Sequence, residues 1–105
     1  MHHMLIERDA QGYLHDPDAW TWDFSERVAL ELGLELHDEH RQLIELVRRF
    51  YRQFGYAPSS RPLIRYAQQE LSPSFDSLIL AQHFPGRSAS LLAKVAGLPK
   101  PPHFL

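Results

Sequence analysis

Residues 38–54, which read DEHRQLIELVRRFYRQF, carry the strongest helical pattern in the chain. An advance of 100° per residue gathers the apolar side chains on one side of this helix and most charged ones on the other. Asp38 is the candidate N-cap, and Gly55 supplies the stop. The apolar side consists of Leu43, Ile44, Leu46, Val47, Phe50, Tyr51 and Phe54, and the charged side of Arg41, Glu45, Arg48, Arg49 and Arg52.

Four further helices, all shorter, are predicted from apolar spacing bounded by caps, glycines and prolines. Pro62 is acceptable in the first turn of the third helix. Three prolines after Gly97 prevent the last helix from continuing, so the chain is expected to end in an extended arm. The start and stop signals of these helices are, in chain order, Thr21 and Gly33, Ser60 or Arg61 and Ser72-Pro73, Ser74 and Phe84-Pro85-Gly86, and Ser88 and Gly97.

The N-terminal segment has a different pattern. Short apolar runs at 5–9 and 13–15 flank a turn with Gly12, which predicts a small β-hairpin that ends at Asp16-Pro17. The expected fold class is therefore α+β and mainly α, with a hairpin or meander packed on about five short helices. A chain of 105 residues suits one domain. We expect a globular domain over 1–96 and a proline-rich C-terminal arm over 97–105.

The chain has no cysteine. This excludes disulfides, thiolate nucleophiles, persulfide carriers and cysteine-based metal sites on this polypeptide. Apolar runs are too short for a spanning helix or a signal peptide, so we expect a cytoplasmic protein with no membrane partner. No cofactor is expected, and His2 and His3 are left out of site arguments because they can be a tag remnant.

Charge is divided along the chain. Residues 1–40 hold ten acidic side chains against two arginines, a net charge of −8, whereas residues 41–105 have a net charge of +6. Arg41, Arg48, Arg49 and Arg52 could therefore hold nucleic-acid phosphates. Two observations favour a solvated face instead: Glu45 lies four residues from both Arg41 and Arg49, and the isoelectric point is about 6.4.

The segment His37-Asp38-Glu39-His40 places two imidazoles three residues apart beside two carboxylates. That spacing could supply metal ligands from one helical turn. No HExxH pattern and no third distant ligand accompany it. Helix capping and local polar contacts are the favoured interpretation, and no metal site is predicted.

Taken in order, a set of short motifs resembles the DsrC/TusE family of sulfur-relay proteins over nearly the whole chain. The resemblance implies a mainly helical fold with a mobile C-terminal arm, whose penultimate cysteine accepts sulfur as a persulfide. It also implies partners in tRNA 2-thiouridine formation for TusE-type members and sulfite reductase for DsrC-type members. The matching residues are Gly12-Tyr13-Leu14, Trp20, Leu36 with His40, Arg48 to Tyr51, Pro58 with Arg61, Phe84-Pro85, and Ala96-Gly97-Leu98-Pro99-Lys100-Pro101.

The departures from the family pattern fall on the reactive positions. Phe104 occupies the penultimate position, and Ala93 stands eleven residues upstream, where DsrC-type members have a second cysteine. A phenyl ring cannot form a persulfide, so the carrier function does not transfer and no catalytic residue is predicted. His37 and Arg41 also depart, since the family usually has Thr and Trp there.

These observations favour a non-catalytic regulatory or partner-binding member of the family. In this hypothesis the arm inserts into a groove of a sulfur-relay or sulfite-reductase partner, because prolines reduce the entropy lost on docking. Three alternatives stay open: the arm folds back on its own surface, the arginine face binds nucleic acid, or another subunit of a sulfurtransferase complex supplies the thiol. The candidate partner-binding residues are Gly97, Leu98, Pro99, Lys100, Pro101, His103, Phe104, Leu105, Arg48 and Arg61.

Overall fold

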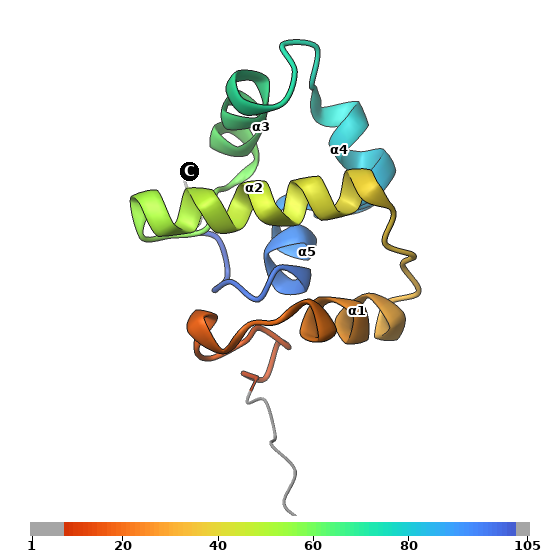
Figure 1. Cartoon of the computed structure of the whole chain (residues 1–105), viewed down its shortest axis with the longest axis vertical. Coiled ribbons are helices and arrows are strands. Elements are labelled where there is room, and N and C mark those ends of the chain that lie inside the picture. The colour runs from red at the N-terminus through yellow and green to blue at the C-terminus, as the bar shows by residue number, and fades with distance from the viewer. Residues whose placement is uncertain (1–7, 103–105) are drawn as a thin grey trace, which may run out of the picture.

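The computed structural model describes residues 8–102, which form an array of helices (Figure 1). The mainly helical class and the five helices predicted from the sequence are confirmed. No helix in this described part is long and apolar enough to cross a membrane. The elements are the 3-10 turn η1 at Pro17–Ala19 and the helices α1 at Trp22–Glu31, α2 at Asp38–Phe54, α3 at Ser60–Glu70, α4 at Ser77–His83 and α5 at Ser88–Val95.

The short helix α5 lies at the centre of the array. Three helices, α1, α2 and α3, pack against it, and Figure 1 shows it between α1 and α2. Leu92 and Val95 of α5 have no exposed surface. Burying such a side chain stabilises the fold by about 1.5–3 kcal/mol. The segment that leads into the C-terminal arm is therefore anchored in the core.

The apolar side of α2 is buried as predicted over most of its length. Leu43, Ile44, Leu46, Val47 and Phe50 are each at most 4% exposed. The pattern fails at the end of the helix, where Phe54 is 47% exposed. The ring centroid of Phe54 lies 4.5 Å from that of Phe50. Phe54 therefore packs on Phe50 at the surface instead of joining the core.

Four helix starts differ from the predicted ones, and one of them is that of α5, whose N-cap is Arg87 instead of Ser88. The N-cap of α2 is His37 instead of Asp38, and that of α3 is Ser59. Helix α4 begins at Ser77 because Asp76 accepts a hydrogen bond from the amide of Ile79 at 2.9 Å. Ser74, the predicted start, forms a turn with Ser72 instead, in which the two hydroxyls lie 2.8 Å apart.

The predicted N-terminal β-hairpin is not supported. Within residues 8–102, strand-type pairing is limited to a single antiparallel bridge between Arg8 and Leu14. The carboxylate of Asp9 accepts hydrogen bonds from the amides of Gln11 and Tyr13, both at 2.9 Å. These bonds close a compact turn, and η1 follows almost immediately, which leaves a single bridge among the described residues. Residues 5–7 of the predicted hairpin lie outside the described part of the chain.

Candidate functional site: the base of the C-terminal arm

The arm leaves α5 through a left-handed turn at Gly97, which has φ of +74°. Its amide donates to the carbonyl oxygen of Lys94 at 3.3 Å, and the amide of Leu98 donates to that of Ala93 at 2.9 Å. This pair of bonds is the Schellman pattern of a helix end. It satisfies carbonyl groups at the end of α5 and sets the direction in which the chain departs. We call residues 96–98 the arm base.

Trp20 lies directly against the arm base. A Cβ atom at position 97 would lie 2.5 Å from Cδ1 of Trp20, a distance that side-chain atoms do not tolerate. The indole nitrogen of Trp20 donates to the hydroxyl of Ser25 at 2.8 Å, and that hydroxyl donates to the carbonyl oxygen of Val95 at 2.7 Å. Gly97 is thus required both for its positive φ and for its missing side chain.

Arg48, in the middle of α2, holds the arm base from the other side. Its guanidinium donates to the carbonyl oxygens of Ala96 at 2.8 Å and Pro17 at 3.0 Å. The same group lies 4.2 Å from the ring centroid of Trp20. Burial, and to a smaller extent the charge of Arg52, lowers the pKa of Arg48. Arg48 therefore acts as a half-buried brace between η1, α2 and the arm base.

The first part of the arm belongs to the packed body. Leu98 has no exposed surface, Pro101 is buried and Pro99 is half-buried, whereas Lys100 is exposed. His103, Phe104 and Leu105 lie outside the described residues. Whether they dock on this chain or on another is therefore still a matter of prediction.

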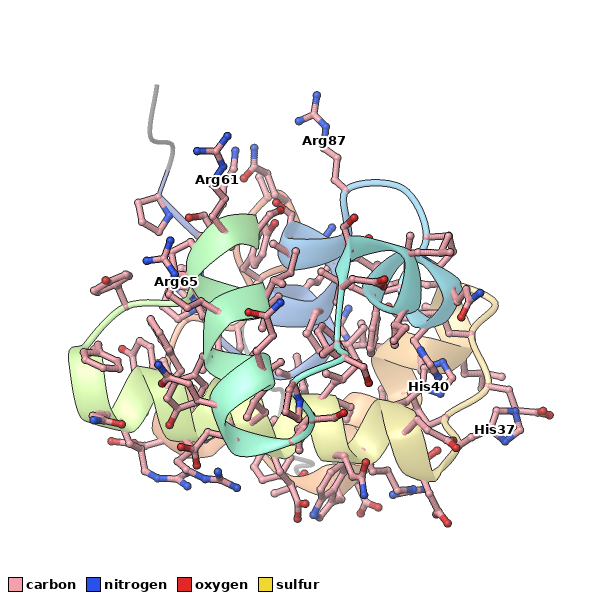
Figure 2. The ribbon with its side chains drawn as sticks, turned by 90° about the horizontal axis from the view of Figure 1, so that it is seen from above. His37, His40, Arg61, Arg65 and Arg87 are labelled. Carbon is pink, nitrogen blue, oxygen red and sulfur yellow. The ribbon has the colours of Figure 1, made fainter. Side chains whose placement is uncertain are left out.

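Arg61, predicted to take part in partner binding, is exposed at the start of α3. Figures 1 and 2 show the arm running from the end of α5 toward this start of α3. In Figure 2, Arg61 projects away from the body on the same side as Arg87. The structure thus places an exposed cation beside the arm, away from the half-buried brace of Arg48.

Ala93, at the upstream sulfur position of the family pattern, is 1% exposed on the inner face of α5. Its carbonyl oxygen accepts the hydrogen bond from Leu98. The methyl group fills part of the core beneath the arm base. At this position the chain offers a packing contact and no reactive group.

Two arginines on the charged side of α2 form ion pairs with glutamates of neighbouring helices. Arg41 forms an ion pair with Glu26 of α1, and Arg49 forms one with Glu70 of α3 at 3.1 Å. Arg41 also lies 5.3 Å from the ring centroid of Trp22. The partners come from other helices and not from Glu45, which the sequence had suggested.

The nucleic-acid hypothesis is consequently not supported. Of its four arginines, two are ion-paired on the surface and Arg48 is committed to backbone carbonyl groups. Arg52, the fourth, is exposed on α2. The ion pair between Arg41 and Glu26 joins the basic half of the chain to the acidic half, so it offsets part of the charge asymmetry.

The two histidines of the His37 to His40 segment have structural roles at the start of α2 (Figure 2). The Nδ1 atom of His40 accepts a hydrogen bond from the amide of His37 at 3.1 Å, and Nε2 lies 3.1 Å from the carbonyl oxygen of His83. His40 is 8% exposed and packs edge-on to Phe84. Desolvation first, and then the nearby His83, lower the pKa of His40. Helix capping, the favoured interpretation, is thus confirmed for His40.

Sequence analysis did not identify Ser25 and Pro17 as part of this site. Ser25 is fully buried, and its hydroxyl links the indole of Trp20 to the carbonyl oxygen of Val95 in α5 through two hydrogen bonds. The carbonyl oxygen of Pro17 accepts a hydrogen bond from Arg48. A lone serine in an amphipathic helix and a backbone oxygen carry no sequence signal. Only the spatial meeting of α1, α2 and α5 reveals them.

Three comparisons describe what the chain is similar to. A family model for DsrC-like proteins matches residues 1–105. The sulfurtransferase TusE of Buchnera aphidicola is 36% identical over 97 residues, which cover 91% of this chain and 85% of that protein.

Among solved structures, DsrC of Allochromatium vinosum superposes with a TM-score of 0.85 at 31% identity and covers 92% of this chain and 88% of its own. The oxidised γ-subunit of the dissimilatory sulfite reductase (DsrC) from Archaeoglobus fulgidus superposes with a TM-score of 0.81 at 26% identity. That match covers 95% of this chain and 92% of the other. Sequence and fold therefore point to the same group of proteins.

Proposed function

Because this chain belongs to the DsrC-like family, we propose that it is a partner-binding member that does not itself carry sulfur. The single observation that carries the proposal is an intact arm base in a chain with no cysteine. Persulfide chemistry requires a thiolate, which Phe104 and Ala93 cannot supply.

In this proposal the arm docks into a groove of a protein that belongs to a sulfur-relay or sulfite-reductase system. The named relatives, a sulfurtransferase and a sulfite reductase subunit, motivate that class of partner. The arm base fixes where the arm starts, and the prolines at 99, 101 and 102 restrict the backbone, so docking costs less entropy. Phe104 supplies an apolar anchor in the place of a reactive atom. The bound chain thereby occupies a site that a cysteine-bearing relative would otherwise enter.

Co-purification from the cells that make the chain tests this function. The intact protein should capture a sulfur-relay or sulfite-reductase protein, identified by mass spectrometry, and a chain without residues 103–105 should not. This truncation is chosen because Leu98 and Pro101 are buried, so removal of the whole arm would also damage the core. Phe104→Ala tests the anchor alone, and Gln42→Ala, an exposed change on α2, is the matched control. Equal capture by the intact and truncated chains would refute docking through the arm.

A further inference from the structure

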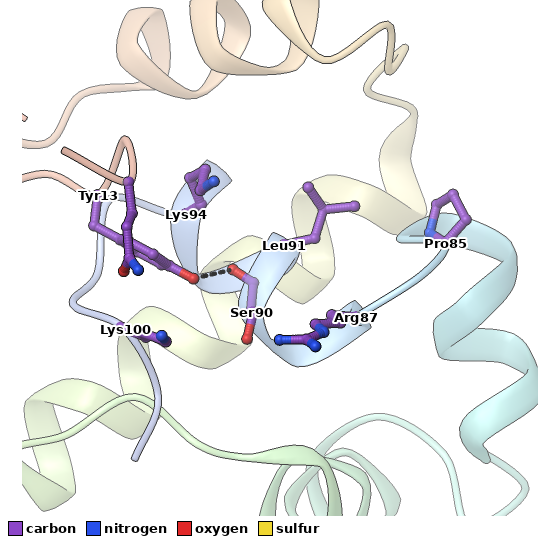
Figure 3. A pocket seen from close by; sticks show the side chains of 8 residues that line it. Tyr13, Pro85, Arg87, Ser90, Leu91, Lys94 and Lys100 are labelled. Atoms are coloured by element: carbon purple, nitrogen blue, oxygen red, sulfur yellow. Dashed lines mark hydrogen bonds between the residues drawn. The ribbon is translucent and has the colours of Figure 1, made fainter. Parts of the chain in front are cut away.

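A cationic pocket opens beside the arm base, on the outer face of α5. It has a volume of about 390 Å³, and its lining includes three basic side chains (Figure 3). Arg87 and Lys94 come from the start and end of α5, and Lys100 comes from the arm. Tyr13, Ser90 and Leu91 also line the pocket, together with Gln11 and Pro85. Among the residues that the structure describes, no acidic side chain lines it.

In the described part of the chain, the three cations pair with no carboxylate. Within residues 8–102, the ion pairs use Arg8, Arg41, Arg49 and His37, and none involves Arg87, Lys94 or Lys100. Like charges gathered at one pocket raise its potential and attract an anionic group. This cluster therefore differs from the arginine face of α2, where neighbouring helices supply the counter-charges.

One side of the pocket is preorganised. The Nζ atom of Lys94 lies 5.1 Å from the ring centroid of Tyr13, and the stem of Lys94 passes over Gly12. The hydroxyl of Tyr13 points to the carbonyl oxygen of Ser90 at 3.5 Å, which orients the ring (Figure 3). A lysine held in this way loses less side-chain entropy when it binds an anion.

The size and the lining select the kind of ligand. A volume of 390 Å³ is more than ten times the roughly 30 Å³ share of one water molecule, so a single small oxyanion would leave most of the space empty. Leu91 and the Tyr13 edge offer apolar surface that a hydrated ion would not use. The face of Tyr13 is covered by Lys94 and is not free to stack on a nucleic-acid base.

We propose that this pocket binds an acidic, partly apolar peptide segment of a protein partner. Carboxylates of the peptide pair with Arg87, Lys94 and Lys100, and an aliphatic side chain lies against Leu91. This binding site is separate from the proposed docking of residues 103–105, because the lining residues on which it rests come from other positions. Arm docking could fail while this site holds, and the reverse is equally possible.

Fluorescence anisotropy on the full chain at low ionic strength tests the proposal. The probe is a fluorescein-labelled hexapeptide, Asp-Leu-Glu-Asp-Leu-Glu, and Asn-Leu-Gln-Asn-Leu-Gln is its neutral counterpart. Only the acidic probe should bind. Arg87→Gln and Lys94→Met should each weaken its binding about two- to fivefold, as expected for partly exposed ion pairs. Arg65→Gln removes the same charge from an exposed site on α3 and should leave the affinity unchanged.

Four results would overturn the proposal. The first is equal affinity for the neutral probe, and the second is an equal loss of affinity in Arg65→Gln. Third, sodium sulfate that displaced the probe at equimolar concentration would make the pocket an oxyanion site. Fourth, if the chain lacking 103–105 bound the probe about tenfold more tightly than the full chain, the occupant would be the chain's own C-terminal carboxylate. Arg87 is exposed, so its substitution leaves the fold intact and the test remains decisive.

Discussion

Trp20 occupies the space that any side chain at Gly97 would need. Because a Cβ at position 97 would lie 2.5 Å from Cδ1 of Trp20, the glycine fixes both the turn and the contact beneath it. The consequences of this contact can be measured on the isolated chain.

Gly97→Ala should lower the free energy of unfolding by about 3 kcal/mol, through left-handed strain and overpacking against Trp20. Gly55→Ala is the matched control: its φ is +83°, and no atom lies within 4 Å of the new Cβ position. It should cost only about 1 kcal/mol. Urea denaturation measures both, and equal losses would show that the tryptophan contact has no energetic weight.

Arg48→Gln should destabilise the chain by about 2 kcal/mol, because two partly buried carbonyl groups lose a charged donor. Arg52→Gln removes the same charge one turn later, at an exposed position, and should change stability by less than about 0.5 kcal/mol. The comparison by urea denaturation separates bracing from net charge. A similar small effect of both substitutions would contradict the brace.

Leu98→Ala tests whether the first residue after the glycine is part of the core. Leu98 has no exposed surface, so its truncation should cost about 3 kcal/mol. Leu78, at 64% exposure on α4, provides the control, and Leu78→Ala should shift stability by less than about 0.5 kcal/mol. Thermal unfolding suffices as the measurement. An unaffected melting temperature in Leu98→Ala would mean that the arm is attached less firmly than its burial indicates.

Acid should destabilise the start of α2. The pKa of His40 is lowered in the folded chain, first by desolvation and then by His83, so the unfolded chain binds the proton more readily. Stability is therefore full above the ordinary histidine pKa of about 6.5 and falls as the pH drops below it. Protonation also removes the Nδ1 acceptor of the His37 amide. In His40→Gln, the free energy of unfolding should depend less steeply on pH over this range, and an identical slope would rule out His40 as its source.

Restoring a thiol should restore sulfur loading. After treatment with polysulfide, from which a thiolate takes one sulfane sulfur and releases the shortened polysulfide, Phe104→Cys should gain the mass of one sulfur atom, whereas the unaltered chain should gain none. Ala93→Cys is the control for position, since a thiol at a site only 1% exposed should react much more slowly. Intact-protein mass spectrometry measures the added mass on the unaltered chain and on both variants. A stable adduct on the unaltered polypeptide would overturn the non-carrier proposal.

Local signals sufficed to predict the helices, but not their first residues. Apolar spacing and glycine stops identified all five helices because each pattern lies within one segment. The caps were missed by one or two residues, because Asp38 and Ser74 are of residue types that favour the N-cap position, yet His37 and Asp76 take it. Which residue caps a helix depends on the contacts of the preceding loop, such as the bond between His37 and His40.

Contacts between distant segments could not be predicted in this way. The two runs around Gly12 favoured a hairpin, yet the Asp9 carboxylate closes a turn in its place. The arginine face of α2 was paired with Glu45 on its own helix, whereas Glu26 and Glu70 arrive from other helices. The cationic pocket likewise draws its residues from segments that only the fold brings together.

Arg48 also determines how the chain bears a mechanical load. A partner that pulls on the arm pulls on Ala96, and the guanidinium of Arg48 passes part of that tension to α2 and to Pro17. The eight residues of α5 are thus not the sole attachment. Force on the arm is therefore shared between α5, α2 and the loop before α1. We expect that a partner can pull on the arm without unwinding α5.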